Sequence, residues 1–226
     1  MADELTLRFP AELWLFLAAR NRVPELRVPY DGTSSLGHVV ESLGVPLTEV
    51  GGIVADGDRV EVRAVGRPQR LPDGQGRFVL DVHLGSLARR LRLVGVDTAY
   101  RNDLDDDQLI EQATAEHRVL LTKDRGLLSR RALPAGAYVR GDRADEQLRD
   151  VLDRFAPPLA PWTRCTACNG TLAPVGKSEV EHLLRPGTRR TQDAFVRCRA
   201  CGHVYWPGAH HGRLEEIVAS AIRVKA

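Results

Sequence analysis

The sequence predicts an α/β protein whose centre is a parallel sheet with helices on both faces. Two short apolar runs, 78–80 and 119–121, are typical of buried strands, and helical spacing of apolar residues fills the chain between them. Each run is followed at once or within three residues by an acid, Asp81 or Asp124. Strands that alternate with helices form parallel sheets, so both acids are expected at the same edge.

The central module is expected to span 77–155. Its helices are predicted at 87–95 and 106–117, where apolar residues recur every three or four positions. After Asp124 the pattern predicts a short helix through Leu127, Leu128 and Arg131, a strand at 137–139, and a helix from Ala144 through Leu152. Two segments rich in proline or glycine, 66–76 and 156–161, are predicted to be linkers.

The first module, 1–66, has apolar residues at alternate positions in three stretches, beginning at Leu5, Leu26 and Val60. Ser34 and Ser35 are plausible N-caps for a helix that Gly44 ends. This small α+β unit resembles a ubiquitin-like β-grasp domain of the sulfur-carrier type, although the stretch from Gly52 to Asp58 is too short for its full set of strands. Because the chain continues from Gly66 without a terminal diglycine, we expect a structural or docking role and no conjugation chemistry.

The third module, 162–226, contains all four cysteines, as Cys165, Cys168, Cys198 and Cys201. Two Cys-x-x-Cys turns supply four thiolates, which is the ligand set of a structural zinc ribbon. A helix from His211 to Val224 carries its apolar residues on one face and is expected to pack back on the protein.

Composition excludes several classes of protein. The chain has 226 residues and a net charge of +2, so a nucleic acid would be bound by a local basic surface and not by the whole molecule. The longest apolar run, 13–19, is too short to span a bilayer. With no basic leader and with paired cysteines that indicate metal, we expect a cytoplasmic protein without a membrane partner.

The acids predict a second metal site. Asp81, Asp124 and the acidic run 103–107 would repel one another if they converged, and a divalent cation relieves that repulsion. Oxygen ligands select Mg²⁺ or Mn²⁺, which can activate water for hydrolysis of a phosphodiester. Thr122 would place a hydroxyl on the same ion or on its water. The alternative is that each aspartate is only a helix cap.

Helix geometry distinguishes the acids of the run 103–107. At about 100° per residue, Asp106 lies on the line of the buried stripe formed by Leu109 and Ile110, whereas Asp105 and Asp107 point to either side. Asp106 is therefore predicted to face the sheet and reach the metal. Asp105 is predicted to be the N-cap.

The central and third modules resemble the Mut-seven C-terminal RNase family in the stretches 78–81, 87–92 and 120–125, in Asp105-Asp106, and in both cysteine pairs. That resemblance implies a PIN-like nuclease domain with a zinc ribbon behind a ubiquitin-like domain, and a metal-dependent ribonuclease. Asp81, Asp106 and Asp124 match the acidic positions of the family. Asp142 and Asp145 are candidates for a fourth acid.

RNA is the expected partner, with the ribosome or a tRNA among the candidates. The basic residues proposed to bind its phosphates flank the acids or lie in the ribbon: Arg89, Arg90, Lys123, Arg125, Arg189 and Arg190. Phe195, Tyr205 and Trp206 either stack on unpaired bases or complete the core of the ribbon.

The main rival hypothesis is an RNA- or ribosome-binding adaptor that keeps the fold but has little or no turnover. A sulfur-carrier or protein-interaction module would rest on residues 4–66 alone, and a toxin of a toxin–antitoxin pair would not need the two appended domains. Convergence of three acids would favour the enzyme over the adaptor.

Overall fold

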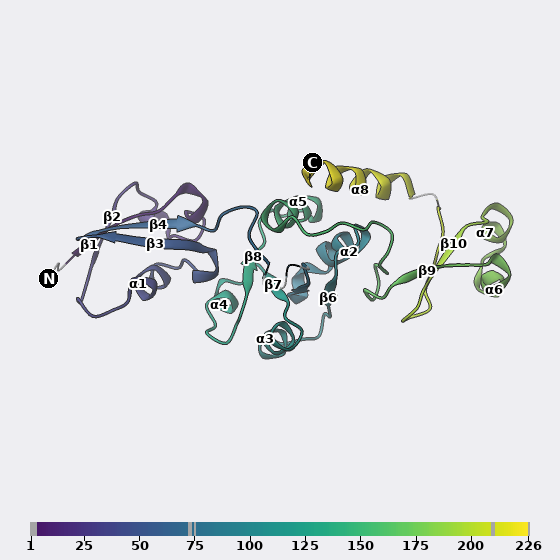
Figure 1. Ribbon diagram of the computed structural model, residues 1–226, viewed down its shortest axis with the longest axis horizontal. Coiled ribbons are helices and arrows are strands. Elements are labelled where there is room, and N and C mark those ends of the chain that lie inside the picture. Colours follow the sequence, from purple (N-terminus) through teal and green to yellow (C-terminus); the bar gives the residue numbers. More distant parts are fainter. Residues whose placement is uncertain (1–3, 72–73, 75, 209–210, 226) are drawn as a thin grey trace.

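The described residues form three sheets that follow one another along the chain. The computed structural model describes residues 4–71, 74, 76–208 and 211–225. A four-stranded sheet, β2-β1-β4-β3, lies at one end of the molecule, a second, β6-β5-β7-β8, in the middle, and a three-stranded sheet, β11-β10-β9, at the other end (Figure 1). This mixed α/β arrangement confirms the predicted fold class.

The N-terminal sheet consists of β1 (Glu4–Arg8), β2 (Leu26–Pro29), β3 (Val50–Asp56) and β4 (Arg59–Ala64). β1 is antiparallel to β2 and parallel to β4, as a β-grasp requires. Helix α1 (Leu36–Ser42) begins after Ser35, whose side chain accepts a hydrogen bond from the backbone N–H of His38. The predicted N-cap is thus confirmed.

Strand β3 was not predicted from the sequence. It pairs antiparallel with β4 as a hairpin, with Asp56 opposite Arg59 and a register shift between Val50 and Gly52. Its residues are half-buried or exposed, so it lacks a clear alternation of apolar and polar side chains. β3 is a strand because it pairs with β4, and the periodicity of apolar residues within β3 does not reveal that pairing.

The central sheet contains β5 (Phe78–Leu80), β6 (Thr98–Tyr100), β7 (Val119–Thr122) and β8 (Gly136–Tyr138), all paired in parallel. Helices α2 (Gly85–Leu93) and α5 (Ala144–Phe155) cover one face. Helices α3 (Asp106–Ala115) and α4 (Arg125–Leu128) cover the other (Figure 1). Alternate strand residues serve the two faces: Phe78 and Leu80 pack with α2 and α5, whereas Val79 packs with α3.

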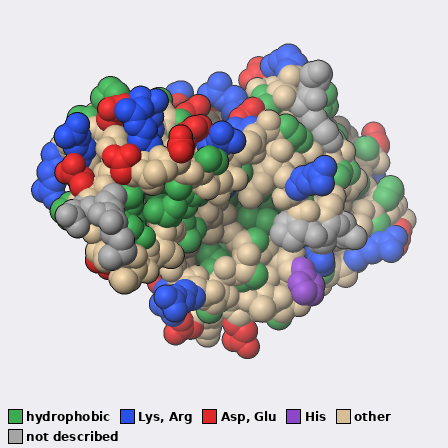
Figure 2. All heavy atoms as spheres, turned by 60° about the vertical axis from the view of Figure 1, so that its left-hand side comes forward, with side chains coloured by type: hydrophobic (Ala, Val, Ile, Leu, Met, Phe, Trp, Pro, Cys, Tyr) green, Lys and Arg blue, Asp and Glu red, His purple; other side chains and the backbone are tan. Residues whose placement is uncertain are grey.

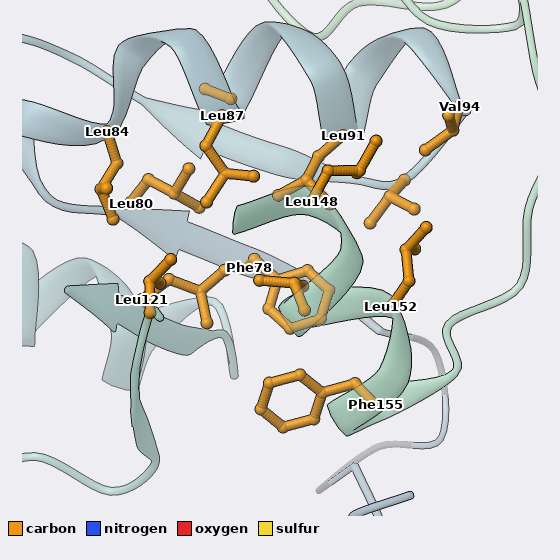
Figure 3. Packing of buried hydrophobic residues seen from close by; sticks show 14 of the residues in the cluster. Phe78, Leu80, Leu84, Leu87, Leu91, Val94, Leu121, Leu148, Leu152 and Phe155 are labelled. Atoms are coloured by element: carbon orange, nitrogen blue, oxygen red, sulfur yellow. The ribbon is translucent and has the colours of Figure 1, made fainter. Parts of the chain in front are cut away.

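The larger core lies between the sheet and the pair α2 and α5. Figure 3 shows Phe78 and Leu121 directed from the strands toward Leu91, Leu148 and other apolar residues of these helices. The ring centroids of Phe78 and Phe155 are 5.3 Å apart. Each such side chain contributes about 1.5–3 kcal/mol through its removal from water. This core holds β5 and β7, the two strands that carry the acids.

Helix α8 (His211–Lys225) closes this core from outside, as expected, through the buried residues Val218 and Ala221. It lies across α5 and α2. In the described ranges, no helix combines the length and the apolar character needed to cross a bilayer.

The C-terminal sheet is antiparallel and consists of β9 (Leu172–Val175), β10 (Phe195–Cys198) and β11 (Val204–Tyr205). Two short helices, α6 (Lys177–Val180) and α7 (Pro186–Thr191), lie in the connection from β9 to β10. The small core consists of four buried residues: Val180, Leu184, Phe195 and Val204. Phe195 therefore belongs to the core, whereas Trp206 is 40% exposed.

Both predicted linkers lie against the central unit. In the first, Arg67 pairs with Asp150 and Asp153 of α5; its residues 72, 73 and 75 fall outside the described ranges. In the second, the N–H of Ala160 donates to Val94 O, just after α2. Gly95 has φ +85°, and a Cβ there would lie 1.9 Å from Ala160 O, so only glycine allows this close crossing.

A buried ion pair joins the N-terminal domain to α5. Nη1 of Arg154 donates to both carboxylate oxygens of Glu49, at 2.7 and 2.8 Å, and the two side chains are only 3% and 2% exposed. Glu49 also accepts a hydrogen bond from the backbone N–H of Tyr138, at the end of β8. Removal of one partner would leave the other charge buried and unpaired, which costs far more than the loss of a surface pair.

We expect Glu49→Gln to lower the free energy of unfolding by about 3–5 kcal/mol, because Arg154 would keep its charge without a counter-charge. The matched control is Glu61→Gln, which removes an exposed pair with Arg63 and should cost less than about 1 kcal/mol. Urea unfolding followed by circular dichroism measures both. Equal effects of the two changes would contradict this assignment.

Candidate active site and metal centre

Two aspartates lie at the carboxyl edge of the central sheet. Asp81 directly follows β5, and Asp124 comes two residues after β7, which is the neighbour of β5. Because the strands are parallel, both acids and the start of α3 share one edge. Asp81 is buried, with 8% of its surface exposed, whereas Asp124 is exposed.

A chain of hydrogen bonds connects these two acids through Thr122. The hydroxyl of Thr122 donates to Oδ2 of Asp81 at 2.6 Å, and the backbone N–H of Asp124 donates to the same hydroxyl oxygen at 2.9 Å. Thr122 is fully buried. Its only proton is given to Asp81, so this hydroxyl fixes the orientation of the carboxylate.

Asp124 is also the N-cap of α4. Its Oδ1 accepts hydrogen bonds from the backbone N–H groups of Gly126 and Leu127, at 2.7 and 3.3 Å. Capping uses one carboxylate oxygen. Sequence analysis left open whether Asp124 is a helix cap or a metal ligand. Because a carboxylate has two oxygens, one oxygen can cap the helix while the other remains available to a metal ion.

The acidic run 103–107 is used in several ways. Asp105 is the N-cap of α3 and forms a capping box with Gln108, as predicted. Asp107 pairs with Arg130 and Asp103 with Arg101. Asp106, which helical geometry predicted to reach the metal, lies in the first turn of α3 and is exposed, as Asp124 is. The buried residues of α3 begin at Leu109.

The acids do not form a tight triplet of carboxylates. Across the described parts of the chain, the four cysteines are the one group of three or more ligand residues close enough to hold a metal ion. Mg²⁺ keeps most of its water and is usually bound through one or two carboxylates, so such an ion does not need a tight triplet of acids. The candidates for a fourth acid are engaged elsewhere: Asp142 pairs with Lys123, and Asp145 pairs with Arg90.

The cysteine sulfurs have the spacing of a tetrahedral metal site. Sγ of Cys165 lies 3.7 Å from Sγ of Cys201, and Sγ of Cys168 lies 3.5 Å from Sγ of Cys198. A tetrahedron with zinc–sulfur distances of about 2.3 Å has edges of about 3.8 Å. The donor set and its spacing therefore fit Zn²⁺.

The environment of the sulfurs makes their ionisation unequal. Burial raises the pKa of the Cys168 thiol to about 12. Burial also opposes ionisation of Cys198, but backbone N–H groups of Cys201 and Ala200 more than offset it and lower the pKa to about 7. Four thiolates together at neutral pH therefore require a cation between them.

The predicted RNA-binding residues divide into engaged and free side chains. Arg125 donates to the carbonyl oxygens of Leu15 and Phe16 in the N-terminal domain, so its guanidinium holds a domain junction. Lys123, Arg90 and Arg189 make intramolecular ion pairs. Arg89 and Arg190 are exposed and make no hydrogen bond or ion pair with other described residues. One face of the molecule shows basic and acidic side chains interspersed around an apolar hollow (Figure 2).

Sequence reasoning missed the residues that attach the first cysteine pair to the central sheet. Arg92 donates to the carbonyl oxygens of Thr166 and Ala167, and Asn169 bonds to Asp97 and Thr98. Arg92 falls four residues after Ala88 on the buried side of α2, and a charged residue at such a position was the available signal.

Comparisons with known proteins agree with this architecture. A family model described as Mut7-C RNAse domain matches residues 76–218, which include the central sheet and both cysteine pairs. A second, described as Mut7-C ubiquitin, matches residues 2–69. No curated protein and no solved structure matches the chain. Since the first match covers more than half of the sequence, the chain belongs to the Mut7-C RNAse domain family, with its ubiquitin-like domain at the N-terminus.

Proposed function

We propose that this protein is a divalent-metal-dependent endoribonuclease whose catalytic edge is formed by Asp81, Asp124 and Asp106. Membership of a ribonuclease family supports a hydrolase that acts on RNA. The observation that carries the proposal is the hydrogen-bonded connection from Asp124 through Thr122 to Asp81. A fully buried hydroxyl that fixes a carboxylate at the edge of a parallel sheet is the arrangement expected of a metal ligand and its positioning residue.

In this proposal Asp81 and Asp124 would hold Mg²⁺ or Mn²⁺, and Asp106 would be the third acid of the site. The ion would supply an activated water and charge stabilisation at the scissile phosphate. Thr122 acts as a positioning residue, because its proton is committed to Asp81. Asp124 keeps its Oδ2 for the site while Oδ1 caps α4.

RNA is proposed to approach across the exposed cations. Among the described residues the guanidinium groups of Arg89 and Arg190 have no partner, so these two residues are the first candidates for phosphate contacts. Lys123, Arg90 and Arg189 could join them only by exchange of their present partners. The ribosome or a tRNA is a proposed partner, and the proposed site of action is the cytoplasm, whose reducing conditions keep the thiols from forming disulfides.

We further propose three units, 1–66, 77–155 and 162–226, the last with one structural zinc at its four cysteines. The sulfur spacing supports this ion.

The exposed side chain of Asp106 favours one alternative. Without a third acid to help activate water, the protein would be an RNA- or ribosome-binding adaptor with weak or no turnover. Binding of RNA without cleavage distinguishes it.

Asp81→Asn should abolish cleavage of single-stranded RNA in Mn²⁺, and Thr122→Val should lower it about 10–100-fold, because the buried carboxylate would lose its orienting bond. Asp142→Asn, whose acid side chain is 97% exposed, is the matched control and should cut at the wild-type rate. Sequencing of the products identifies cleavage sites. Cleavage that persists in excess EDTA would exclude the metal mechanism, and wild-type binding without cleavage would favour the adaptor.

Asp106→Asn should lower the cleavage rate more than Asp105→Asn or Asp107→Asn. Asp105 is a cap that Asn can replace, so that change should cost at most about 1 kcal/mol of stability. Asp107 forms an exposed ion pair with Arg130. Rates under single-turnover conditions, together with unfolding curves, separate the two effects. A rate unchanged in Asp106→Asn would remove this residue from the site.

Protein purified without chelator should contain one zinc per chain, and Cys168→Ser should lose it and unfold the C-terminal sheet first. Elemental analysis and urea unfolding measure this. Ser178→Ala, an exposed change in the same unit, is the control. Wild-type protein without zinc would refute the site.

A further inference from the structure

Arg92 is a buried cation at the junction between the central sheet and the first cysteine pair. It lies in the last turn of α2 and is 3% exposed. Its Nε donates to Thr98 O at 2.9 Å, at the start of β6. Its Nη1 donates to Thr166 O and Ala167 O, at 3.2 and 2.8 Å. Those two carbonyl groups belong to the residues between Cys165 and Cys168.

No carboxylate balances this charge in the described part of the protein. The other deeply buried arginines each have one, since Arg154 pairs with Glu49 and Arg118 pairs with Asp97. A guanidinium removed from water is stable only beside negative charge or a full set of acceptors. Arg92 has three carbonyl oxygens and lacks an anionic oxygen. A further source of negative charge nearby would therefore stabilise this buried cation.

The cysteine sulfurs can supply that charge. Cys165 and Cys168 are the residues on either side of the two carbonyl groups that Arg92 binds. Four thiolates around Zn²⁺ carry a net charge of −2, and all four are present only when the metal is bound. A zinc-loaded centre thus has the sign and position to balance Arg92.

The residue after the cysteine pair makes a second attachment. Oδ1 of Asn169 accepts a hydrogen bond from the N–H of Thr98 at 3.1 Å, and its Nδ2 donates to Asp97 at 2.8 Å. Asn169 has φ +71°, a left-handed conformation that Asn tolerates better than most residues. The segment from α2 to β6 therefore contacts both the residues between the two cysteines and the residue that follows the second one.

We propose that Arg92 is a positioning residue for the zinc centre: it balances the charge of the tetrathiolate and fixes the backbone between Cys165 and Cys168. Zinc binding and the packing of α2 against β6 are then thermodynamically coupled. This inference rests on the zinc site of the proposed function and is independent of RNA cleavage. Because linkage is reciprocal, weakening of Arg92 must weaken zinc binding.

The test compares Arg92→Gln and Arg92→Lys with Arg154→Gln, an equally buried arginine at the opposite junction of the full-length protein. Zinc affinity is measured by competition with a chromophoric chelator, and urea unfolding is measured with and without zinc. Arg92→Gln should lower zinc affinity about 10–100-fold, the range typical of residues that orient metal ligands. Arg92→Lys keeps the charge but loses the planar fork, so its loss should be smaller.

Arg154→Gln should lower stability while it leaves zinc affinity within about 3-fold of wild type, since Arg154 contacts Glu49 and not the cysteine pairs. If Arg92→Gln unfolds the protein, Arg92→Lys still reports zinc affinity. Unchanged zinc affinity in the Arg92 variants, or destabilisation equal with and without zinc, would overturn this inference alone. Wild-type protein that binds no zinc would overturn the zinc site and this inference together, whatever its activity on RNA.

Discussion

Two arginines removed from water hold the molecule together, and each needs a partner from a different part of the chain. Arg154 meets Glu49 of the N-terminal domain, and Arg92 meets the backbone of the first cysteine pair. The penalty for an unpaired buried ion is several kcal/mol, so each junction is stable only when both sides are in place. The central sheet is therefore fixed relative to both neighbours and is not merely tethered to them.

The contacts between the N-terminal domain and the central sheet extend to the sheet edge where Asp81 and Asp124 lie. Glu49 accepts a bond from Tyr138 at the end of β8, and the ring of Phe16 packs edge-on against Tyr138 at 5.2 Å. Arg125, directly after Asp124, donates to carbonyl groups of the same N-terminal segment and lies over the ring of Phe16. The ubiquitin-like domain thus contacts the residues beside a candidate catalytic acid. A docking role fits these contacts better than carrier chemistry does.

The way each charged residue is used shows why composition alone is a weak guide to RNA binding. Arg125 and Lys123 flank Asp124 in the sequence, yet both bond to the protein itself. Arg89 and Arg190 make no such contacts among the described residues and keep their guanidinium groups free for phosphate. An arginine that has already lost its water to an internal partner gains little from a phosphate, because the exchange replaces one pair with another.

The sequence by itself determined the strands β5 and β7, the acids that follow them, the capping role of Asp105 and the four sulfur ligands. These features depend on neighbours within a few residues, through apolar periodicity, hydrogen bonding in one helical turn and the spacing of Cys-x-x-Cys. Only the tertiary structure decided that β3 is a strand, that Thr122 donates to Asp81, that Asp106 faces solvent, and that Arg92 and Arg154 are buried. Each of these depends on a partner distant in the sequence, and a pairing across that distance leaves no periodic signal in either segment.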